Sequence, residues 1–368
     1  MKVSKDEQLA QRFFRLNTCV TILLLITIVV SVFQFGTVAW NRHQQVGLVL
    51  VGRKEDPGWN RTQYRGMKEA CDALGFELLI QENVREGEGN CRKAVQELVQ
   101  RHAKLVFMTN TTSLRDMKDI VKAYPGLRFF GMELDPSVFE FNRYMVRYVE
   151  PFYLAGILAG LRTKTEKVGF VAPSPGPEFC QAINAFTLGV LRIRPQAHVF
   201  LAWTGGMENR AGEEQAVRDF KANSVDAMAY FQDGETIPAA ADRAGIYFIS
   251  MYEAYPAYHC RMAAIQVDWK KTYLNILRNN LRRFDRAIYW ATILDRSVDI
   301  RPVTSALSAR ERAIFETEYW EVRQGKPVFS GEIYDRNGIR RCDVGETISN
   351  QSLPRMNWLV RGVRVIGN

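Results

Sequence analysis

The chain has 368 residues, of which 47% are hydrophobic and 24% are charged, so it holds enough apolar material for a folded body larger than one ordinary domain. Its formal net charge is +9, but basic and acidic residues are interleaved along the chain rather than gathered in one basic block. Since no zinc-finger spacing, RNA-recognition motif or basic-region zipper accompanies this charge, we expect no nucleic-acid partner.

The N-terminal region has the pattern of a membrane anchor. Residues 1–15 form a short basic tail, and residues 16–40 contain no charged side chain. About twenty apolar residues span a bilayer, and the positive-inside rule leaves the basic tail in the cytoplasm. We therefore predict one transmembrane helix, a location in the cell membrane and an extracytoplasmic body. The alternative is a cleavable signal peptide, with Thr37-Val-Ala39 as its cleavage site.

The cysteines do not form a metal or redox motif. The six of them are widely separated, at Cys19, Cys71, Cys91, Cys180, Cys260 and Cys342. Metal sites and redox motifs require close pairs, so neither a metal nor another cofactor is predicted. An extracytoplasmic body permits disulfides, and Cys71–Cys91 or Cys260–Cys342 are possible pairs; the alternative is buried free thiols.

From residue 44 onward, strand-like apolar runs alternate with segments of helical length. In chain order we expect a strand at 45–51, a helix at 62–74, a strand at 76–80, a helix at 90–101, a strand at 104–108, a helix at 113–124 and a strand at 127–131. Short apolar runs of this kind are typical of buried parallel strands. Their alternation with helices predicts a parallel sheet with right-handed crossovers.

The same alternation continues after a segment rich in small residues. Ala155, Gly156, Ala159 and Gly160 lie three to four positions apart, which allows one helical face to approach a neighbouring backbone closely. Strands are expected at 167–171, 197–201, 225–230 and 245–249, and a closing hairpin at 328–338 with its turn at Asn337-Gly338. We thus expect an α/β protein of two doubly wound parallel-sheet lobes. The predicted division is 44–150 for lobe 1, 151–258 for lobe 2, and 259–368 for a return to lobe 1 and the closing hairpin.

Ligands in doubly wound folds meet the carboxyl ends of the strands, so the loops that follow the strands hold the candidate site. The candidates from these loops are Asp56, Trp59, Asn60, Thr109, Asn110, Thr111, Trp203 and Asp233. Trp59 and Trp203 would close on a flat ring from opposite lobes, and the polar side chains would read its edges. The alternatives are ordinary packing for the aromatic residues and helix capping for the polar ones.

Three consecutive motifs resemble one known family. They are Tyr153-Leu-Ala-Gly-Ile-Leu-Ala-Gly160, the strand within Thr163–Val171, and Asn184-Ala-Phe-Thr-Leu-Gly189. Their order and wording resemble the basic membrane protein family of bacterial solute-binding proteins, which includes lipoproteins that bind purines and nucleosides. The resemblance implies a type I periplasmic-binding-protein fold, hinge crossings between the lobes, a ligand in the interlobe cleft and an ABC permease as partner.

The chain also departs from this family. Nucleoside-binding members place an Asp near the end of a second-lobe strand, whereas this chain reads Ile249-Ser-Met-Tyr-Glu253; Tyr252 and Glu253 are the candidate substitutes. Trp269 resembles an Asp-Trp pair of one branch, with a hinge or packing role as the alternative to ligand binding. A lipobox cysteine follows the apolar core, whereas Cys19 precedes the core at 21–30, so lipid anchoring is not predicted. A free purine base or another small ring is at least as well supported as a nucleoside.

No motif for catalysis is present. The four histidines are isolated, and the sequence contains neither a Gly-x-Ser-x-Gly elbow nor a Walker loop, so we expect no enzyme. The predicted function is that of an extracytoplasmic solute-binding protein of an ABC transporter, with a purine base or nucleoside-like ligand. The alternative is a membrane-anchored ligand sensor or regulator that uses the same binding domain with a membrane partner and without transport.

Overall fold

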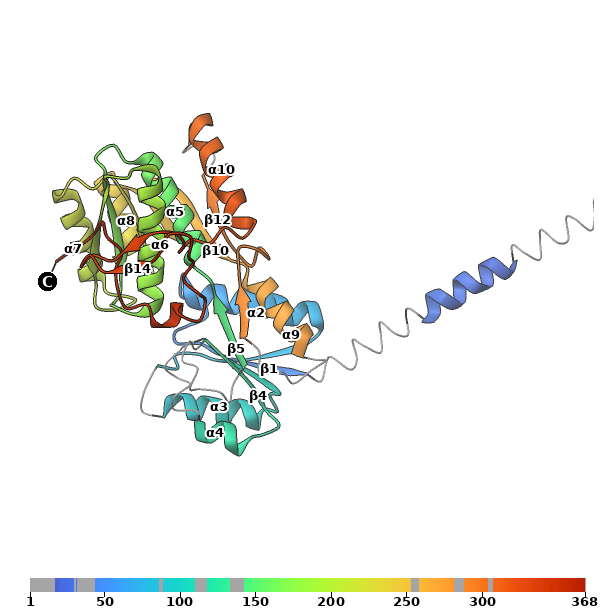
Figure 1. The fold of residues 1–368 in the computed structure, drawn as a ribbon. Helices are drawn as coiled ribbons and strands as arrows, with labels where there is room; N and C mark the ends of the chain where they lie inside the picture. Colours follow the sequence, from blue (N-terminus) through green and yellow to red (C-terminus); the bar gives the residue numbers. More distant parts are fainter. Residues whose placement is uncertain are drawn as a thin grey trace, which may run out of the picture.

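The protein folds into two α/β lobes that lie against each other, as the ribbon of the computed structural model shows (Figure 1). The structure describes residues 17–29, 31, 44–85, 89–109, 118–132, 142–252, 258–280, 288–303 and 307–367. Each lobe is built on one central sheet, which confirms the predicted α/β architecture of two doubly wound lobes.

The first lobe contains a six-stranded sheet in which every pair of neighbouring strands is parallel. Its strands, in spatial order, are β2 (Glu77–Gln81), β1 (Gln45–Val49), β3 (Leu105–Met108), β4 (Arg128–Gly131), β5 (Asn142–Val146) and β11 (Ile288–Ala291). All of β3 and nearly all of β1 are buried. Burial on both faces explains why these strands are continuous apolar runs.

Within the described residues, four helices belong to the first lobe. They are α2 (Trp59–Leu74), α3 (Asn90–Gln100), α4 (Lys118–Ala123) and α9 (Trp269–Asn280). Helix α2 ends at Gly75, whose φ of 71° places it in the left-handed region where glycine is favoured, and its N–H closes the last turn. Helix α9 packs against α2, and the Cβ and backbone of Trp269 leave no space for a side chain at Gly66.

The second lobe contains a seven-stranded sheet. Its strands, in spatial order, are β12 (Val298–Pro302), β10 (Arg261–Val267), β9 (Tyr247–Met251), β8 (Ala227–Tyr230), β6 (Lys167–Ala172), β7 (His198–Trp203) and β15 (Val363–Ile366). All neighbours are parallel except β12, which runs antiparallel to β10 at the edge. The expectation of a wholly parallel second sheet is therefore wrong at this edge.

The helices of the second lobe include the pair that the sequence motifs predicted to pack closely. They are α5 (Val149–Arg162), α6 (Pro177–Ile193), α7 (Arg210–Ala222), α8 (Thr236–Ala244) and α10 (Ala309–Arg323). A Cβ atom at Gly156 of α5 would lie 2.0 Å from the Phe186 carbonyl oxygen, and one at Gly189 of α6 would lie 2.1 Å from the Tyr153 carbonyl oxygen. The two backbones touch at these glycines, which confirms the predicted close approach.

The chain changes lobe three times. It leaves the first sheet after β5, returns between β10 and α9, and crosses again between β11 and β12. The predicted division therefore differs from the strand pairing, because β10, β12 and β15 all belong to the second sheet and only α9 and β11 return to the first lobe. The central part of β10 is fully buried, so this strand needs partners on both sides, and β9 and β12 provide them.

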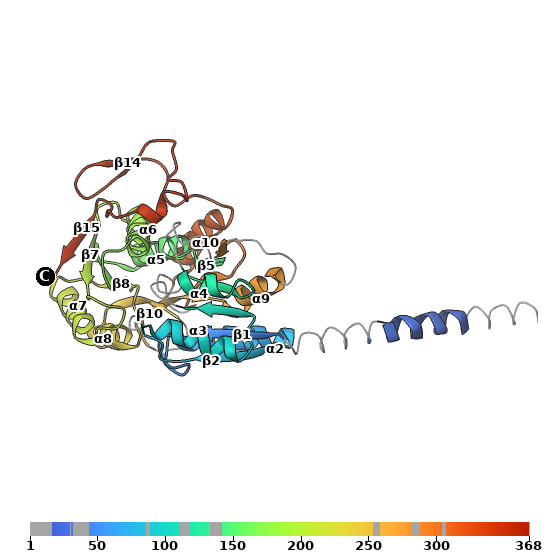
Figure 2. The ribbon, with the colours of Figure 1, turned by 90° about the horizontal axis from the view of Figure 1, so that it is seen from below.

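A C-terminal segment, residues 327–362, runs over the α6 side of the second lobe before β15 joins the sheet beside β7 (Figure 2). It contains the hairpin of β13 (Ile333–Tyr334) and β14 (Arg340–Cys342), near the predicted position, and the 3-10 turn η3 (Leu353–Arg355). Asn184 of α6 holds this segment: its Nδ2 donates to the Trp358 carbonyl at 2.9 Å, and its Oδ1 accepts the Val360 N–H at 2.8 Å.

The predicted membrane anchor is only partly covered by the structure. Residues 17–29 form a helix with exposed side chains, while residues 1–16, 30 and 32–43 lie outside the described residues. Across the described part of the chain, no helix combines the length and apolarity needed to cross a bilayer. The transmembrane helix is therefore not shown.

All six cysteines lie in described residues, and all are free thiols. The possible disulfides Cys71–Cys91 and Cys260–Cys342 are therefore wrong, and the alternative of unbridged cysteines holds. Cys71, Cys91, Cys180 and Cys342 are buried. Burial raises the pKa of Cys71 to about 12 and that of Cys180 to about 11, which keeps both thiols protonated and unreactive.

Candidate functional site

The two lobes meet at the carboxyl ends of their strands, through Trp59 and Asp233. Trp59 is the first residue of α2 in the first lobe, and Asp233 follows β8 in the second. The Trp59 backbone N–H donates to both carboxylate oxygens of Asp233, at 3.1 and 3.3 Å. A carboxylate at a helix N-terminus accepts an otherwise unpaired N–H and faces the positive end of the helix dipole. Asp233 therefore bridges the lobes by capping α2.

Asp233 is an unusual carboxylate because it is 8% exposed. Burial raises its pKa to about 6, the charges of Glu208 and Glu213 add to the rise, and the donated N–H groups of Trp59 and Gly234 oppose it. The contact between the lobes thus depends on a group that titrates near neutral pH.

Trp59 and Trp269 form an aromatic contact beside this bridge. Their ring centroids lie 5.5 Å apart at an interplanar angle of 86°, and the Trp59 indole N–H donates to the Thr109 carbonyl at 3.2 Å. Trp269 is 2% exposed and also packs against Tyr273. Its indole nitrogen is buried and, within the described residues, has no hydrogen-bond partner. Trp59 is held in a fixed orientation, while Trp269 retains one donor that the protein leaves unused.

The other predicted polar residues of the first lobe shape its loops. Asp56 accepts the Arg53 N–H at 2.6 Å, Asn60 accepts the Gly52 N–H at 3.1 Å, and the Thr109 hydroxyl donates to the Val49 carbonyl at 2.9 Å. These bonds fix the backbone that follows β1 and β3. They agree with the structural alternative for these side chains and leave ligand contact as a prediction.

The remaining predictions are divided between described and undescribed positions. Trp203 is half-buried at the end of β7, opposite Ala172 of β6, and no aromatic ring of the described residues contacts it. Tyr252 is buried, with a φ of 68°, and its N–H donates to the Ile265 carbonyl at 2.9 Å. Asn110, Thr111 and Glu253 lie outside the described residues. A ring held between Trp59 and Trp203 stays a prediction.

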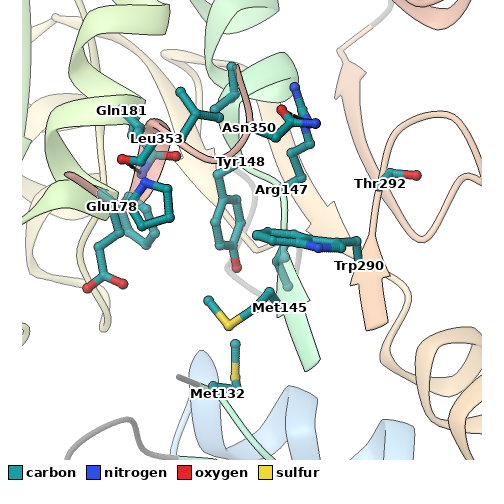
Figure 3. A pocket seen from close by; sticks show the side chains of 15 residues that line it. Met132, Met145, Arg147, Tyr148, Glu178, Gln181, Trp290, Thr292, Asn350 and Leu353 are labelled. Atoms are coloured by element: carbon teal, nitrogen blue, oxygen red, sulfur yellow. Dashed lines mark hydrogen bonds between the residues drawn. The ribbon is translucent and has the colours of Figure 1, made fainter. Parts of the chain in front are cut away.

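A cavity of about 240 Å³ opens between the lobes on the side of β5 and β11, and we call it the junction cavity (Figure 3). Met132 and Met145 of the first lobe lie at one end, Tyr148 and Trp290 along one wall, and Glu178 and Gln181 of α6 on the opposite side. Asn350 and Leu353 of the C-terminal segment also line it. Aromatic and thioether groups dominate the walls, with a few polar groups among them, as in small-molecule sites generally.

The junction cavity is braced by hydrogen bonds and ring contacts. Arg147 donates to Glu150 and, at 2.7 Å, to Asn350, so its guanidinium joins the hinge to the C-terminal segment. The Tyr148 ring packs against Phe231 with centroids 4.9 Å apart. The Tyr148 hydroxyl is buried and unpartnered among the described residues, and burial, with the charges of Glu178 and Asp233, raises its pKa. This hydroxyl is a donor directed into the interlobe region that also contains Asp233.

None of the sequence-predicted residues that the structure describes lines the junction cavity. Its walls come from hinge residues near 147, from the first turns of α6 and from the distant segments near 290 and 350. The usable signal was the hinge itself, because Tyr148 directly precedes the small-residue helix α5. No local pattern marks Trp290 or Asn350 as cavity residues. Among the described residues, no group of three His, Cys, Asp or Glu side chains is placed to hold a metal ion.

Comparison with known proteins places the chain in a family. The family model for PnrA-like ABC transporter substrate-binding proteins matches residues 43–282, more than half of the chain. The chain belongs to this family. It is therefore a solute-binding protein and not an enzyme. The resemblance read from the three sequence motifs is confirmed.

Individual relatives agree with this assignment. A purine-binding protein of Brucella abortus is 24% identical over 328 residues, which cover 87% of this chain and 92% of the relative. An ABC transporter solute-binding protein from Conexibacter woesei has a similar structure, with a TM-score of 0.64, 18% identity and coverage of 77% of this chain and 97% of the other. The structure of a transcriptional activator of the comK gene from Bacillus halodurans is also similar, with a TM-score of 0.65 and 17% identity. The match covers 76% of this chain and 98% of the other. The structural likenesses confirm the periplasmic-binding-protein-like fold.

Proposed function

We propose that this family member binds a purine base or a similar flat nitrogen heterocycle between its lobes, outside the cytoplasm, and presents it to an ABC permease. The observation that carries the proposal is the enclosed, aromatic-walled junction cavity beside the bridge between Trp59 and Asp233. The similarity to a purine-binding protein along nearly the whole chain supports the ligand class.

The dimensions and chemistry of the site favour a compact ring. Small-molecule pockets commonly measure about 300–1,000 Å³, and the junction cavity, at about 240 Å³, suits one small molecule rather than a chain of sugars or a peptide. Aromatic faces stack on flat rings. The unused donor of Tyr148, which lines the cavity, matches the ring nitrogens of a purine, which accept hydrogen bonds.

The first experiment is a thermal-unfolding screen of the full-length chain against purine bases, nucleosides, sugars and amino acids. A ligand that binds only the folded protein raises the melting temperature. We expect a rise with purine bases and a smaller or absent one with sugars and amino acids. The same rise with every class, or none with purines in protein shown to be folded and ligand-free, would sink the proposal.

Four variants then locate the ring. Trp290→Ala and Tyr148→Phe alter the junction cavity, whereas Trp59→Ala and Trp203→Ala remove the predicted stacking pair. Loss of a stacking or hydrogen-bonding group costs about 1 kcal/mol or more, so affinity should fall at least several-fold at the residues that touch the ring. Tyr334→Ala, on β13 and outside the junction cavity, serves as the aromatic control. Unchanged affinity in all four site variants would reject an interlobe ring.

Uptake of the identified ligand separates transport from sensing. Cells that lack this protein should lose uptake of the ligand and regain it when the wild-type chain is supplied. Binding without any effect on uptake would instead support the sensor, which uses the same cleft.

A further inference from the structure

A second cavity lies away from the interlobe cleft, against the edge of the second sheet. It measures about 680 Å³ and is bounded by β10, β12, the start of α9 and the last turns of α10. We call it the basic groove. Gln266 of β10 and Asp299 of β12 are paired neighbours in the sheet and form part of its floor, and Tyr319 and Trp320 of α10 form a wall.

Positive charge predominates around the basic groove. Four cationic side chains line it, Lys271, Arg296, Arg301 and Arg323, against two carboxylates, Asp268 and Asp299, which gives a net charge of +2. Both carboxylates already accept hydrogen bonds from neutral donors: Asp268 from the Lys271 N–H, and Asp299 from the Tyr319 hydroxyl. Within the described chain, no salt bridge joins Arg296, Arg301 or Arg323 to a carboxylate.

Two buried donors of the basic groove lack a partner. The Gln266 side-chain amide nitrogen and the Arg323 Nε are both buried and, among the described residues, donate to no protein atom. Buried N–H groups are nearly always paired, so each unpaired one requires an explanation. The Arg323 guanidinium lies 6.0 Å from the Tyr319 ring centre and 5.8 Å from that of Trp320. Both rings lie at the outer limit of cation–π contact, so Arg323 stays beside the aromatic wall, and its planar fork of N–H donors suits an oxyanion.

We propose that the basic groove is a second ligand site, separate from the interlobe cleft, that takes a small molecule bearing a phosphate or carboxylate group. Arg301 and Arg323 bind the oxyanion, and the Gln266 amide donates the further hydrogen bond. Trp320, which is 56% exposed, offers its face to the rest of the molecule. The volume is within the range of about 300–1,000 Å³ common for small-molecule sites, so the groove accepts more than a lone ion.

The test titrates the full-length chain with inorganic phosphate, pyrophosphate and citrate by calorimetry, at low ionic strength and with chloride as the reference anion. We expect saturable binding of at least one oxyanion and none of chloride. Hydrogen bonds to charged groups are the stronger ones, so Arg301→Gln and Arg323→Gln should each weaken binding about tenfold or more. Binding of the phosphates without citrate would identify a phosphate-bearing ligand, and binding of citrate alone would identify a carboxylate-bearing one. Binding of both would identify a general oxyanion site.

Arg310→Gln is the matched control. Arg310 is an exposed arginine at the opposite end of α10, about 20 Å away along the helix. The Arg310→Gln variant should bind the anions as tightly as the wild type does. If it lost as much affinity as the groove variants, the binding would reflect the general positive charge of the protein, and the proposal would be overturned. Binding should also change the tryptophan fluorescence, and Trp320→Phe should abolish this change. No saturable binding of any of the three anions, in chain shown to be folded, would equally overturn it. These variants should leave purine binding unchanged, so the proposal of an oxyanion site and the proposal of a purine site can be rejected separately.

Discussion

Asp233 shows how one residue is read differently from sequence and from structure. The sequence marks it as a polar side chain after a strand of the second lobe, where a ligand contact or a helix cap would both be expected. In the structure it caps α2 of the first lobe, 174 positions away in the chain. Capping was an open alternative, but the identity of the capped helix depends on how the lobes meet. No local pattern carries that information.

The raised pKa of Asp233 predicts a dependence of stability on pH. Its folded pKa of about 6 lies above the ordinary value of 3.8, so the folded protein binds this proton more tightly than the unfolded chain does. The resulting stabilisation is complete below about pH 4 and is lost as the pH rises through 6. A pKa shift of about two units corresponds to about 3 kcal/mol of folding free energy. Compared with Asp233→Asn, the wild type should therefore lose stability between about pH 4 and 7 and change little above that.

The measurement is the denaturant midpoint of both proteins across this pH range. Glu214→Gln, at an exposed i,i+4 ion pair with Arg210, is the control for a general effect of charge. A gap between wild type and Asp233→Asn that stays constant with pH would contradict the assigned pKa.

At the scale of elements, the contact between α5 and α6 explains the motifs that resembled the family. Gly156 and Gly189 lie where the helices touch, and a side chain at either position would meet a backbone carbonyl at about 2 Å. Overpacking a core costs about 1–3 kcal/mol, and more where backbone must move. Gly156→Ala and Gly189→Ala should each lower the free energy of unfolding by at least that amount. Gly126→Ala, which meets no atom within 4 Å, should have little effect in the same denaturant titration.

Asn184 connects α6 to the C-terminal segment. It is fully buried, and both ends of its amide bond the backbone of residues 358–360. Asn184→Leu would leave a buried N–H and a buried carbonyl unpaired, at a cost of about 1–3 kcal/mol each. The expected result is a lower unfolding midpoint and faster proteolysis of the C-terminal segment. Asn223→Ala removes only an exposed bond to the Asp219 carbonyl and should leave both unchanged.

Elements were predictable to within a few residues. The predicted strand at 104–108 is β3 (Leu105–Met108), and the predicted helix at 62–74 is α2, which begins three residues earlier at Trp59. Apolar runs and helical periodicity fix the existence of an element, because they reflect burial on one or both faces. The exact ends depend on caps, and Gly58 precedes α2 with no side-chain cap for a sequence pattern to mark.

For the whole molecule, the sequence predicted two doubly wound lobes but not the assignment of the last third of the chain. Strands β10, β12 and β15 could have joined either sheet, because β10 is a buried run that fits both, and the short β12 and β15 carry charged residues and no pattern that selects a partner. The sheet that each strand joins is decided by its pairing with strands that are distant in the sequence, and no local pattern specifies this pairing. The junction cavity was missed for the same reason, since Trp290 and Asn350 reach it only after the chain has crossed between lobes.

The free cysteines give a prediction for the whole molecule. Titration of the denatured chain with a thiol reagent, without reductant, should count all six cysteines. In the folded protein Cys19 should react quickly because it is exposed, and Cys71 and Cys180 should react only as the protein unfolds, because their pKa values are raised to about 12 and 11. A count of four or fewer in denatured protein would show a disulfide. Rapid reaction of Cys71 in folded protein would contradict its burial.

The position of β15 bears on how the protein is made. When the ribosome has released the chain only as far as β11, every strand of the first sheet is available, but the second sheet still lacks β12 and β15. The outer edge of β7 then presents unpaired N–H and carbonyl groups of the kind that recruit strands from other chains. The second lobe therefore completes its edge only after residues 363–366 emerge, and until then the nascent chain exposes an unpaired strand edge that favours association with other chains.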